Sequence, residues 1–339
     1  MMKLELLALC ALGALTASCA HGFVDVPLEG ETMGSTWHIK LKVPSDQTAR
    51  AQAMQKPIEA TLARIVAEMS TYEPSSEISR FNAWKSTAPF PCSHEVAVVV
   101  TESIEVGHDT DGAFDITVDP LINLWGFDRK GPRDTPPAEN EIALAQEHVG
   151  LAHIKVVGDA ISKDDPEVTI NLGGIAAGFS VDVVAAQLEA AGFHDMMVEI
   201  TGELIARGTS SKGRPWNIGI KTPDIDAHDV VTSVPVTDKA VTTSGSYHNF
   251  FEANGKRYSH IIDPVTGAPV QTDLVSVTVL ADDALTADGY DTPFIIIGEE
   301  RARAVMAKKK GMEALFIHAV PGANGAVTWK ITRTDGFPR

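Results

Sequence analysis

The sequence feature that most constrains the fold is a glycine pair between a β-branched run and a helical pattern. Residues 168–170 (Val-Thr-Ile) favour a strand, Gly173-Gly174 follows, and apolar residues then recur at helical spacing from Ile175 to Gly192. Glycine lacks the Cβ that would keep a ligand from the backbone, and the first helical turn carries N–H groups without helical partners. The pattern predicts a strand, a turn and a helix, either as a phosphate-binding turn or as a tight connection that binds nothing.

Composition and charge narrow the class of function. Of the 339 residues, 44% are hydrophobic and 22% are charged, as in ordinary globular proteins. The formal net charge of −17 argues against a nucleic-acid binder, which needs a basic surface. An anionic ligand would therefore need local help from backbone N–H groups or from a divalent cation.

Residues 1–19 have the pattern of an export signal. Residues 6–15 are apolar but too few to span a bilayer, and small residues lead to Cys19, as at a lipoprotein processing site. We expect an exported, periplasmic protein anchored to the bacterial inner membrane by a lipid on Cys19, and ordinary cleavage near Ala20 is the alternative. Cys10 lies inside the signal, which leaves Cys92 without an obvious disulfide partner.

The remaining pattern mixes hairpins with helices and favours an α+β fold over a doubly wound parallel sheet. Residues 111–120 are expected to be loop-like. The predicted hairpin joins 249–252 to 257–262 through Asn254-Gly255. The other predicted elements are an extended segment at 24–43, helices at 50–69, 95–107, 138–149 and 299–309, strands at 198–200, 274–280 and 314–319, and an edge strand at 327–332.

Asp288 and Thr292 are the first candidates for chemistry. On a helix, a spacing of four puts the carboxylate and the hydroxyl on one face, and both are hard oxygen donors that suit Mg²⁺. The alternative is a solvated helix start capped by Asp288. Asp282, Asp283 and Asp291 crowd the same region, and their mutual repulsion favours a bridging cation.

His260 could accept a proton from an attacking hydroxyl, or it could be a half-exposed hairpin residue. The sequence contains no H-x-x-x-H, G-x-S-x-G, Walker A or G-x-G-x-x-G pattern, which argues against zinc-protease, serine-hydrolase, P-loop and Rossmann sites. Tyr72, Phe114, Trp125 and Phe127 could form the wall of a site for a flat ring, although Trp125 and Phe127 are expected in the core.

Seven segments together resemble the ApbE family of FAD:protein FMN transferases. The most specific match is 111–127 (DGAFDITVDPLINLWGF), and the resemblance covers roughly residues 24–320. It implies one α+β domain over 24–335 with a T-fold-like architecture of mostly antiparallel sheets flanked by helices. The other matching segments are 33–36, 69–82, 171–182, 243–245, 259–267 and 288–292.

The resemblance implies a reaction and a set of site residues. The family binds FAD with Mg²⁺, breaks the pyrophosphate, passes FMN to a Thr or Ser hydroxyl of an acceptor flavoprotein and releases AMP. The implied metal ligands are the main-chain oxygen of Gly174 and the side chains of Asp288 and Thr292, with His260 as the base. The implied contacts to the flavin nucleotide are Met33, Tyr72, Ala113, Phe114, Asp115, Ala177, His260 and Ile262.

The sequence departs from the family pattern at four positions. Asn171 and Asp119 stand where Asp and Gly are usual, and Pro293 stands where a small residue is usual. Ala177 replaces the usual Lys and removes a cationic contact to the nucleotide, which leaves Mg²⁺ and glycine N–H groups to neutralise the pyrophosphate. Two other functions fit the same residues: a Mg²⁺-dependent FAD pyrophosphatase that uses water as the acceptor, and a non-catalytic exported flavin-binding lipoprotein.

Overall fold

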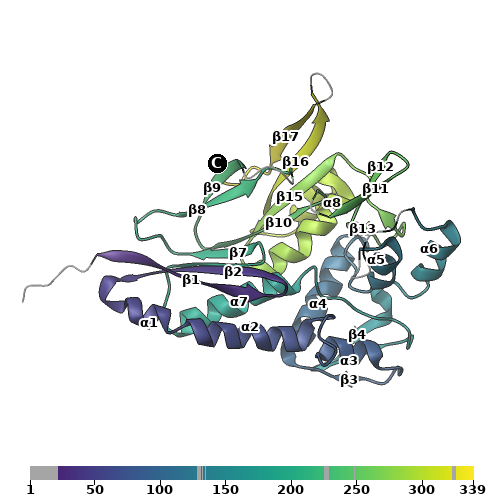
Figure 1. The fold of residues 1–339 in the computed structure, drawn as a ribbon, viewed down its shortest axis with the longest axis horizontal. Helices are drawn as coiled ribbons and strands as arrows, with labels where there is room; N and C mark the ends of the chain where they lie inside the picture. Colours follow the sequence, from purple (N-terminus) through teal and green to yellow (C-terminus); the bar gives the residue numbers. More distant parts are fainter. Residues whose placement is uncertain are drawn as a thin grey trace, which may run out of the picture.

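The computed structural model describes residues 22–127, 131, 133, 135–224, 229–247, 249–322 and 326–339. The expected signal and Cys19 therefore lie outside the described residues. The centre of the fold is an eight-stranded antiparallel sheet in the order β1-β2-β6-β7-β10-β15-β16-β17 (Figure 1). Its strands are β1 (Phe23–Thr32), β2 (Ser35–Pro44), β6 (Met196–Ile200), β7 (Glu203–Arg207), β10 (Lys239–Gly245), β15 (Leu274–Ala281), β16 (Glu313–Pro321) and β17 (Val327–Arg333).

Two long helices, α7 and α8, pack directly on this sheet. Helix α7 contacts β6 and β7, and α8 contacts β7, β10 and β15, while α2 packs on α7 and α4 packs on α8 (Figure 1). The described helices are α1 (Thr48–Gln52), α2 (Gln55–Met69), α3 (Glu77–Ala83), α4 (His94–Asp109), α5 (Asp119–Trp125), α6 (Glu139–Gln146), α7 (Ala176–Ala190) and α8 (Ala284–Met306).

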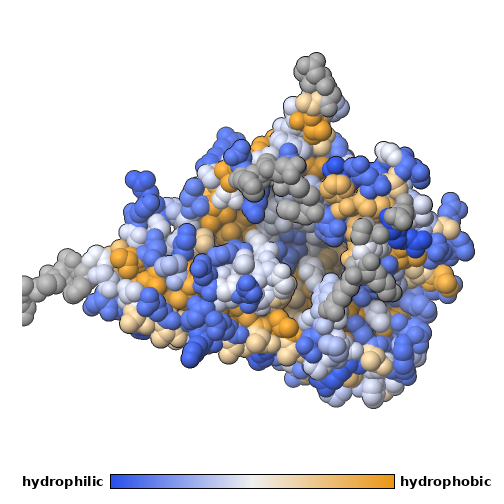
Figure 2. All heavy atoms as spheres, in the orientation of Figure 1, coloured by the Kyte–Doolittle hydropathy of each residue, from blue (hydrophilic) through white to orange (hydrophobic). Residues whose placement is uncertain are grey.

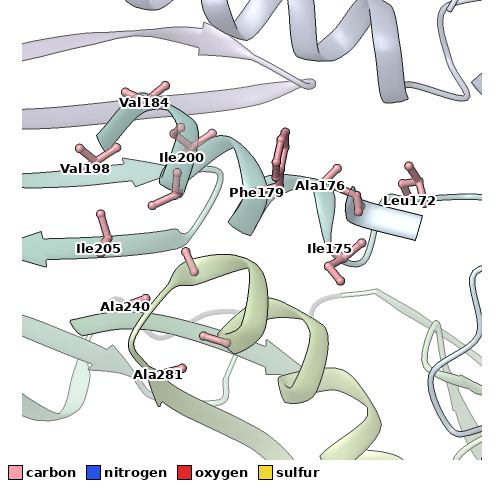
Figure 3. Close-up of a cluster of buried hydrophobic side chains, with 14 of the residues drawn as sticks. Leu172, Ile175, Ala176, Phe179, Val184, Val198, Ile200, Ile205, Ala240 and Ala281 are labelled. Carbon is pink, nitrogen blue, oxygen red and sulfur yellow. The ribbon is translucent and has the colours of Figure 1, made fainter. Parts of the chain in front are cut away.

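The alternation of side chains along the strands creates a core on each face of the sheet. On β15, Val279 belongs to the main core under the helices and Leu280 to a second core, and on β16 Phe316 and Leu315 divide in the same way. Figure 3 shows Phe179 and Val184 of α7 beside the strand residues of the main core. The second core is covered by a separate hairpin of β8 (Trp216–Lys221) and β9 (Val230–Val236).

A third, smaller core supports the loops that carry the candidate site. Trp125 at the end of α5 stacks on Tyr258 with ring centroids 5.5 Å apart, and its Nε1 donates to the Gly267 carbonyl oxygen at 2.8 Å. Tyr258 lies in the hairpin of β11 (Phe250–Ala253) and β12 (Lys256–Ser259), whose turn residues Asn254 and Gly255 both have positive φ. The remaining strands are β13 (Ile262–Asp263), β14 (Ala268–Pro269), β3 (Phe90–Pro91), β5 (Ala160–Lys163) and β4 (Ile154–Val156).

Most of the predicted elements are confirmed. The fold is α+β with mainly antiparallel pairing, the Asn254-Gly255 hairpin is present, and β17 is an edge strand. The extended segment at 24–43 is two strands joined at Met33-Gly34, and the helix at 50–69 is interrupted at 53–54. The helix expected at 299–309 corresponds to the last part of α8, which runs from Ala284 to Met306 and is kinked at Gly298, where the backbone is not helical.

The strand predicted at 168–170 is wrong. Val168 and Ile170 are buried, but the segment is not assigned to a strand, and side chains bind its backbone instead. The Asn82 side chain donates to the Ile170 carbonyl and accepts from the Ile170 N–H, both at 2.8 Å. Lys163 Nζ donates to the Val168 carbonyl at 2.7 Å. These bonds satisfy backbone groups that a sheet neighbour would otherwise satisfy.

The remaining sequence expectations concern membranes and cysteines. No helix within the described residues combines the length and the apolar character needed to cross a bilayer. On the face drawn in Figure 2, hydrophobic residues form separate patches among hydrophilic ones. Cys92 is a free cysteine, as predicted, and burial raises the pKa of its thiol to about 11.

Candidate functional site

Two adjoining cavities contain the predicted site residues. The first has a volume of about 410 Å³ and the second about 750 Å³, and Tyr72, Asn171 and Gly173 line both. Of the predicted residues, Met33 and Ala177 line the second cavity and Tyr72 lines both. The others, which all line the first cavity, are Ala113, Phe114, Asp115, Gly174, His260, Ile262, Asp288 and Thr292. The fold thus gathers these residues from segments far apart in the chain.

Asp288 is buried at the contact between α7 and α8. Its Oδ2 accepts a hydrogen bond from the Gly178 N–H at 2.8 Å, and the residue is only 6% exposed. A Cβ on Gly178 would lie 2.2 Å from the Ala284 carbonyl oxygen, so only glycine permits this close approach of the two helices. The carboxylate therefore accepts from one N–H group of the first turn of α7.

The alternative interpretation of Asp288 as a solvated helix cap is wrong. The residue that caps α8 is Asp283, whose side chain accepts from the Thr286 N–H at 2.8 Å. Asp288 lies in the second turn and points into the protein, where the carboxylate loses its hydration. A buried carboxylate needs a compensating partner, which makes this position a candidate for binding a cation.

Four acidic residues, Asp115, Glu203, Asp288 and Asp291, line the first cavity. Burial, together with repulsion from Glu203, raises the pKa of Asp288 and of Asp291 well above the usual range. Burial likewise raises the pKa of Glu203. The Thr292 hydroxyl lies 2.8 Å from Ser244 Oγ and 3.2 Å from Asp291 Oδ1. The cavity therefore offers hard oxygen atoms on carboxyl groups that crowd one another.

This donor set fits a divalent cation that binds few carboxylates. Among the described residues, no group of three or more His, Cys, Asp or Glu side chains is arranged to hold a metal ion. Mg²⁺ does not require such a group, because it takes one or two carboxylates and completes its shell with other oxygens. The side chains of Asp288 and Thr292 and the main-chain oxygen of Gly174 would supply that mixture. Their role as ligands stays a prediction.

The glycine turn is held in place by side-chain hydrogen bonds. The Gly173 N–H donates to Asn171 Oδ1 at 2.8 Å, and Asn171 Nδ2 donates to Asp119 Oδ1 at 2.7 Å. A Cβ on Gly174 would lie 3.7 Å from Phe114 Cε2, so the turn runs beside that ring. Two departures from the family pattern, Asn171 and Asp119, are thus in direct contact.

His260 lies directly after β12 at the edge of the first cavity. Its Nδ1 is 3.1 Å from the Asn249 carbonyl oxygen, and its ring is 6.4 Å from the Phe127 ring between centroids. A neutral imidazole that donates Nδ1–H to a carbonyl carries its lone pair on Nε2. The geometry is therefore compatible with a proton acceptor. The proposed role as a base stays a prediction.

Asp115 also lines the first cavity and is 9% exposed. Burial raises the pKa of its carboxyl, although Oδ1 accepts hydrogen bonds from the Thr117 N–H at 2.7 Å and from Thr117 Oγ1 at 2.5 Å. These bonds fix the bend at 115–117 that brings Phe114 toward the glycine turn. The expectation that 111–120 is loop-like is confirmed up to the start of α5 at Asp119.

Sequence reasoning misses or misplaces several residues that line the first cavity. Phe127, expected in the core, is only partly buried and faces the cavity, whereas Trp125 is a core residue as expected. Glu203 gives no signal because it begins β7 directly after a short turn, and only the folded sheet brings it to Asp288. Ser244 stands out in the sequence only as part of a resembling segment.

The comparisons with known proteins cover nearly the whole chain. Residues 33–316 match the model of the ApbE family. The chain is 42% identical over 304 residues to an FAD:protein FMN transferase of Vibrio cholerae, covering 90% of each protein. It is 38% identical over 309 residues to the protein of the same name from Salmonella typhimurium, covering 89% of this chain and 86% of that one.

Solved structures agree with these relatives. The flavin transferase ApbE from Vibrio cholerae superposes with a TM-score of 0.82 at 39% identity, covering 93% of this chain and 98% of that one. The apo form of the Pseudomonas stutzeri flavinyl transferase ApbE gives a TM-score of 0.80 at 35% identity, covering 93% and 96%.

Proposed function

The chain belongs to the ApbE family and is an FAD:protein FMN transferase, and from this premise we propose that its reaction is Mg²⁺-dependent, modifies a Thr or Ser hydroxyl of an acceptor protein and releases AMP. The observation that carries this proposal is the pair of adjoining cavities that share the Asn171–Gly173 segment, with buried oxygen donors beside it. FAD has two nucleotide halves joined by a pyrophosphate, and a two-part site with a common border matches that shape.

Different residues would bind the flavin ring, the AMP half and the pyrophosphate of FAD. Phe114, Phe127 and Ile262 give the first cavity apolar surfaces suited to a flat flavin ring, and Met33 and Ala177 belong to the second cavity, which would take the AMP half. The glycine turn lies on the border, where its backbone can approach the pyrophosphate closely. Because Ala177 carries no charge, neutralisation of the pyrophosphate falls to the N–H groups and to the cation.

Asp288, Thr292 and the Gly174 carbonyl would hold the divalent cation. When bound, such an ion supplies charge neutralisation that makes the AMP phosphate a better leaving group. The protein's contribution is positional, because Gly178 fixes the Asp288 carboxylate and burial excludes competing water. Phosphoryl transfer depends mainly on such positioning and electrostatics.

The transfer step forms one bond and breaks another. The acceptor hydroxyl oxygen bonds to the phosphorus of the FMN half, the bond from that phosphorus to the bridging oxygen breaks, and AMP leaves with the bridging oxygen. His260 Nε2 accepts the hydroxyl proton, while the Asn249 carbonyl orients the ring through Nδ1. Water in place of the hydroxyl would give free FMN and AMP instead.

Incubation with FAD and a Thr-containing acceptor flavoprotein tests the proposal. With Mg²⁺, we expect the acceptor to gain one FMN by mass spectrometry and an equal amount of AMP to appear. EDTA should stop both, and replacing the acceptor Thr by Ala should abolish labelling. Free FMN with AMP and no labelled acceptor would show a pyrophosphatase, and labelling that is unaffected by EDTA would refute the metal requirement.

We also propose that the protein is exported and anchored to the inner membrane through a lipid on Cys19. The support is the apolar segment 6–15 followed by small residues and Cys19. Mass spectrometry of the mature N-terminus should find a diacylated Cys19, and a Cys19→Ser variant should move from the membrane fraction to the periplasmic fraction. An unmodified N-terminus after residue 20 would contradict the proposal.

A further inference from the structure

Asp119 has no role in the reaction described above, yet it touches the turn on which that reaction depends. Its Oδ1 accepts a hydrogen bond from Asn171 Nδ2 at 2.7 Å. Asn171 and Gly173 line both cavities, and Gly174 lines the first. Asp119 is the first residue of α5, whose Leu121 and Trp125 are buried in the third core, so its backbone is firmly anchored.

The hydrogen-bond pattern allows only one orientation of the Asn171 amide. The oxygen end accepts from the Gly173 N–H at 2.8 Å, and the nitrogen end donates to Asp119. If the amide turned over, two donors would face each other at Gly173 and two acceptors at Asp119. The fit is also close, because a Cβ on Gly173 would lie 3.0 Å from Asn171 Oδ1. The Gly173 N–H and the Asp119 carboxylate therefore select this orientation together, and Asp119 is the only one of the two partners that is a side chain.

We propose that Asp119 is a positioning residue that acts through Asn171 to hold the Gly173-Gly174 turn in the geometry that receives a dinucleotide pyrophosphate and its cation. The inference rests on the proposed function for the ligand, and on the hydrogen bonds for the mechanism. Asp119 itself touches neither reacting atoms nor metal ligands in this account. Its effect is on the affinity for FAD, because the turn lies on the border between the two cavities.

The contact between Asn171 and Asp119 requires a hydrogen-bond donor at one position and an acceptor at the other. An aspartate at position 171 would place two carboxylate oxygens about 2.7 Å apart, where like charges repel strongly. Exchanging the two residue types should restore the bond, because the amide introduced at position 119 could then donate to the carboxylate introduced at position 171. The single Asn171→Asp variant should therefore be defective, and the double variant N171D/D119N should recover.

The experiment measures the dissociation constant of FAD, by flavin fluorescence in Mg²⁺ and well below the unfolding temperature, together with KM and kcat. Asn171→Asp and Asp119→Ala should weaken FAD binding roughly 10- to 100-fold, the range expected for losing a hydrogen bond to a charged group. N171D/D119N should return to within about threefold of the wild type, a residual of less than about 1 kcal/mol. Asp119→Asn alone should stay close to the wild type, because its amide oxygen can still accept from Asn171.

A second double variant tests whether the change in net charge, rather than the hydrogen bond, accounts for any recovery of FAD affinity. Glu73 lines the second cavity without contacting Asn171 in this arrangement, and N171D/E73Q has the same net charge as N171D/D119N. N171D/E73Q should not recover FAD affinity. Recovery equal to that of N171D/D119N, or no recovery in N171D/D119N, would overturn the proposal.

Thermal unfolding of the flavin-free variants completes the test. N171D should lower Tm, and N171D/D119N should restore most of the loss, which tests the contact even if no flavin binds. A pair that only stabilised the fold would move Tm and leave the FAD dissociation constant unchanged, and that result would also overturn the proposal. A wild type that binds no FAD would refute the proposed function. The Tm values of the single and double variants would still show whether residues 171 and 119 interact.

Discussion

At the scale of single residues, the site depends on one buried carboxylate. Asp288 is held by the Gly178 N–H in an environment that raises its pKa by burial and by repulsion from Glu203. Without a cation such a group is destabilising, and with one it is a ligand. On the proposed function, the same residue would link stability to metal binding.

Replacing Asp288 by Asn should separate these two effects. We expect Mg²⁺-dependent transfer to fall by at least about 100-fold, because a neutral amide is a poor ligand for Mg²⁺. The metal-free variant should be as stable as the wild type or more stable, because a buried negative charge is removed. Turnover and urea unfolding in EDTA measure the two quantities, and full activity in Asp288→Asn would remove this residue from the metal site.

His260 permits a second test at this scale. His260→Ala should slow transfer by about 10²–10⁴-fold, the usual contribution of a general base, while FAD still binds. The measurements are the transfer rate across pH and FAD binding by fluorescence. An unchanged rate at all pH values would make His260 a structural residue that only packs beside Phe127.

Single residues also mark where sequence reasoning reaches its limit. Asp288, Thr292 and His260 can be selected because their types and spacing suggest chemistry, and the fold does bring them to one cavity. Glu203 cannot, because its proximity to Asp288 exists only once β7 lies beside α8. The contact between Asn171 and Asp119 is equally hidden, although both residues depart from the family pattern.

At the scale of elements, the instructive case is the segment at 168–170. Its β-branched residues predict a strand, and Val168 and Ile170 are indeed buried, but Asn82 and Lys163 make hydrogen bonds to backbone groups that a neighbouring strand would otherwise bind. Local propensity specifies an extended backbone, but it does not specify the partner. The helices are predicted better, because their periodicity is a local property.

Asn82→Ala should therefore loosen the connection that leads into the glycine turn. The change leaves the N–H and carbonyl of Ile170 without their partner, and each lost bond costs about 1 kcal/mol or more when the group is buried. We expect a loss of roughly 2–3 kcal/mol in the free energy of unfolding. Urea unfolding measures it, with Asn217→Ala on the exposed side of β8 as a matched control that should change little. A loss equal to that of the control would contradict the account.

At the scale of the whole molecule, buried acids connect stability to pH. Asp182 on α7 accepts hydrogen bonds from the Ala284 and Leu285 N–H groups at the start of α8, and burial raises the pKa of its carboxyl from 3.8 to about 6. The folded state thus binds a proton at Asp182 more tightly than the unfolded state does. The stability from this group is complete below pH about 4 and is lost as pH rises through about 6.

The Asp182→Asn variant isolates this contribution. Between about pH 4 and 7 the wild type should lose about 2 kcal/mol of stability relative to Asp182→Asn, because the variant cannot ionise at this position. Denaturant unfolding of both proteins across that range gives the difference. A difference that stays constant with pH would show that the pKa of Asp182 is the same in the folded and unfolded states.

From the sequence, the fold class and the order of many elements can be predicted, but the complete architecture cannot. Mixed hairpins and helices correctly indicate α+β, but the sequence does not predict β7, β8, β9 or β10, and the second core depends on them. Short strands with few period-two repeats carry little local signal. The resemblance to a family supplies the architecture that periodicity cannot.

The central claim is that Asp288, Thr292 and the Gly174 carbonyl together bind a divalent cation beside the pyrophosphate of FAD. A crystal grown with FAD and Mn²⁺ tests this directly, because the anomalous signal of the ion locates it independently of the protein. We predict an ion within about 2.5 Å of an oxygen atom from each of the three residues, in contact with a pyrophosphate oxygen. An ion bound elsewhere, or these three oxygens too far apart to share one ion, would contradict the account.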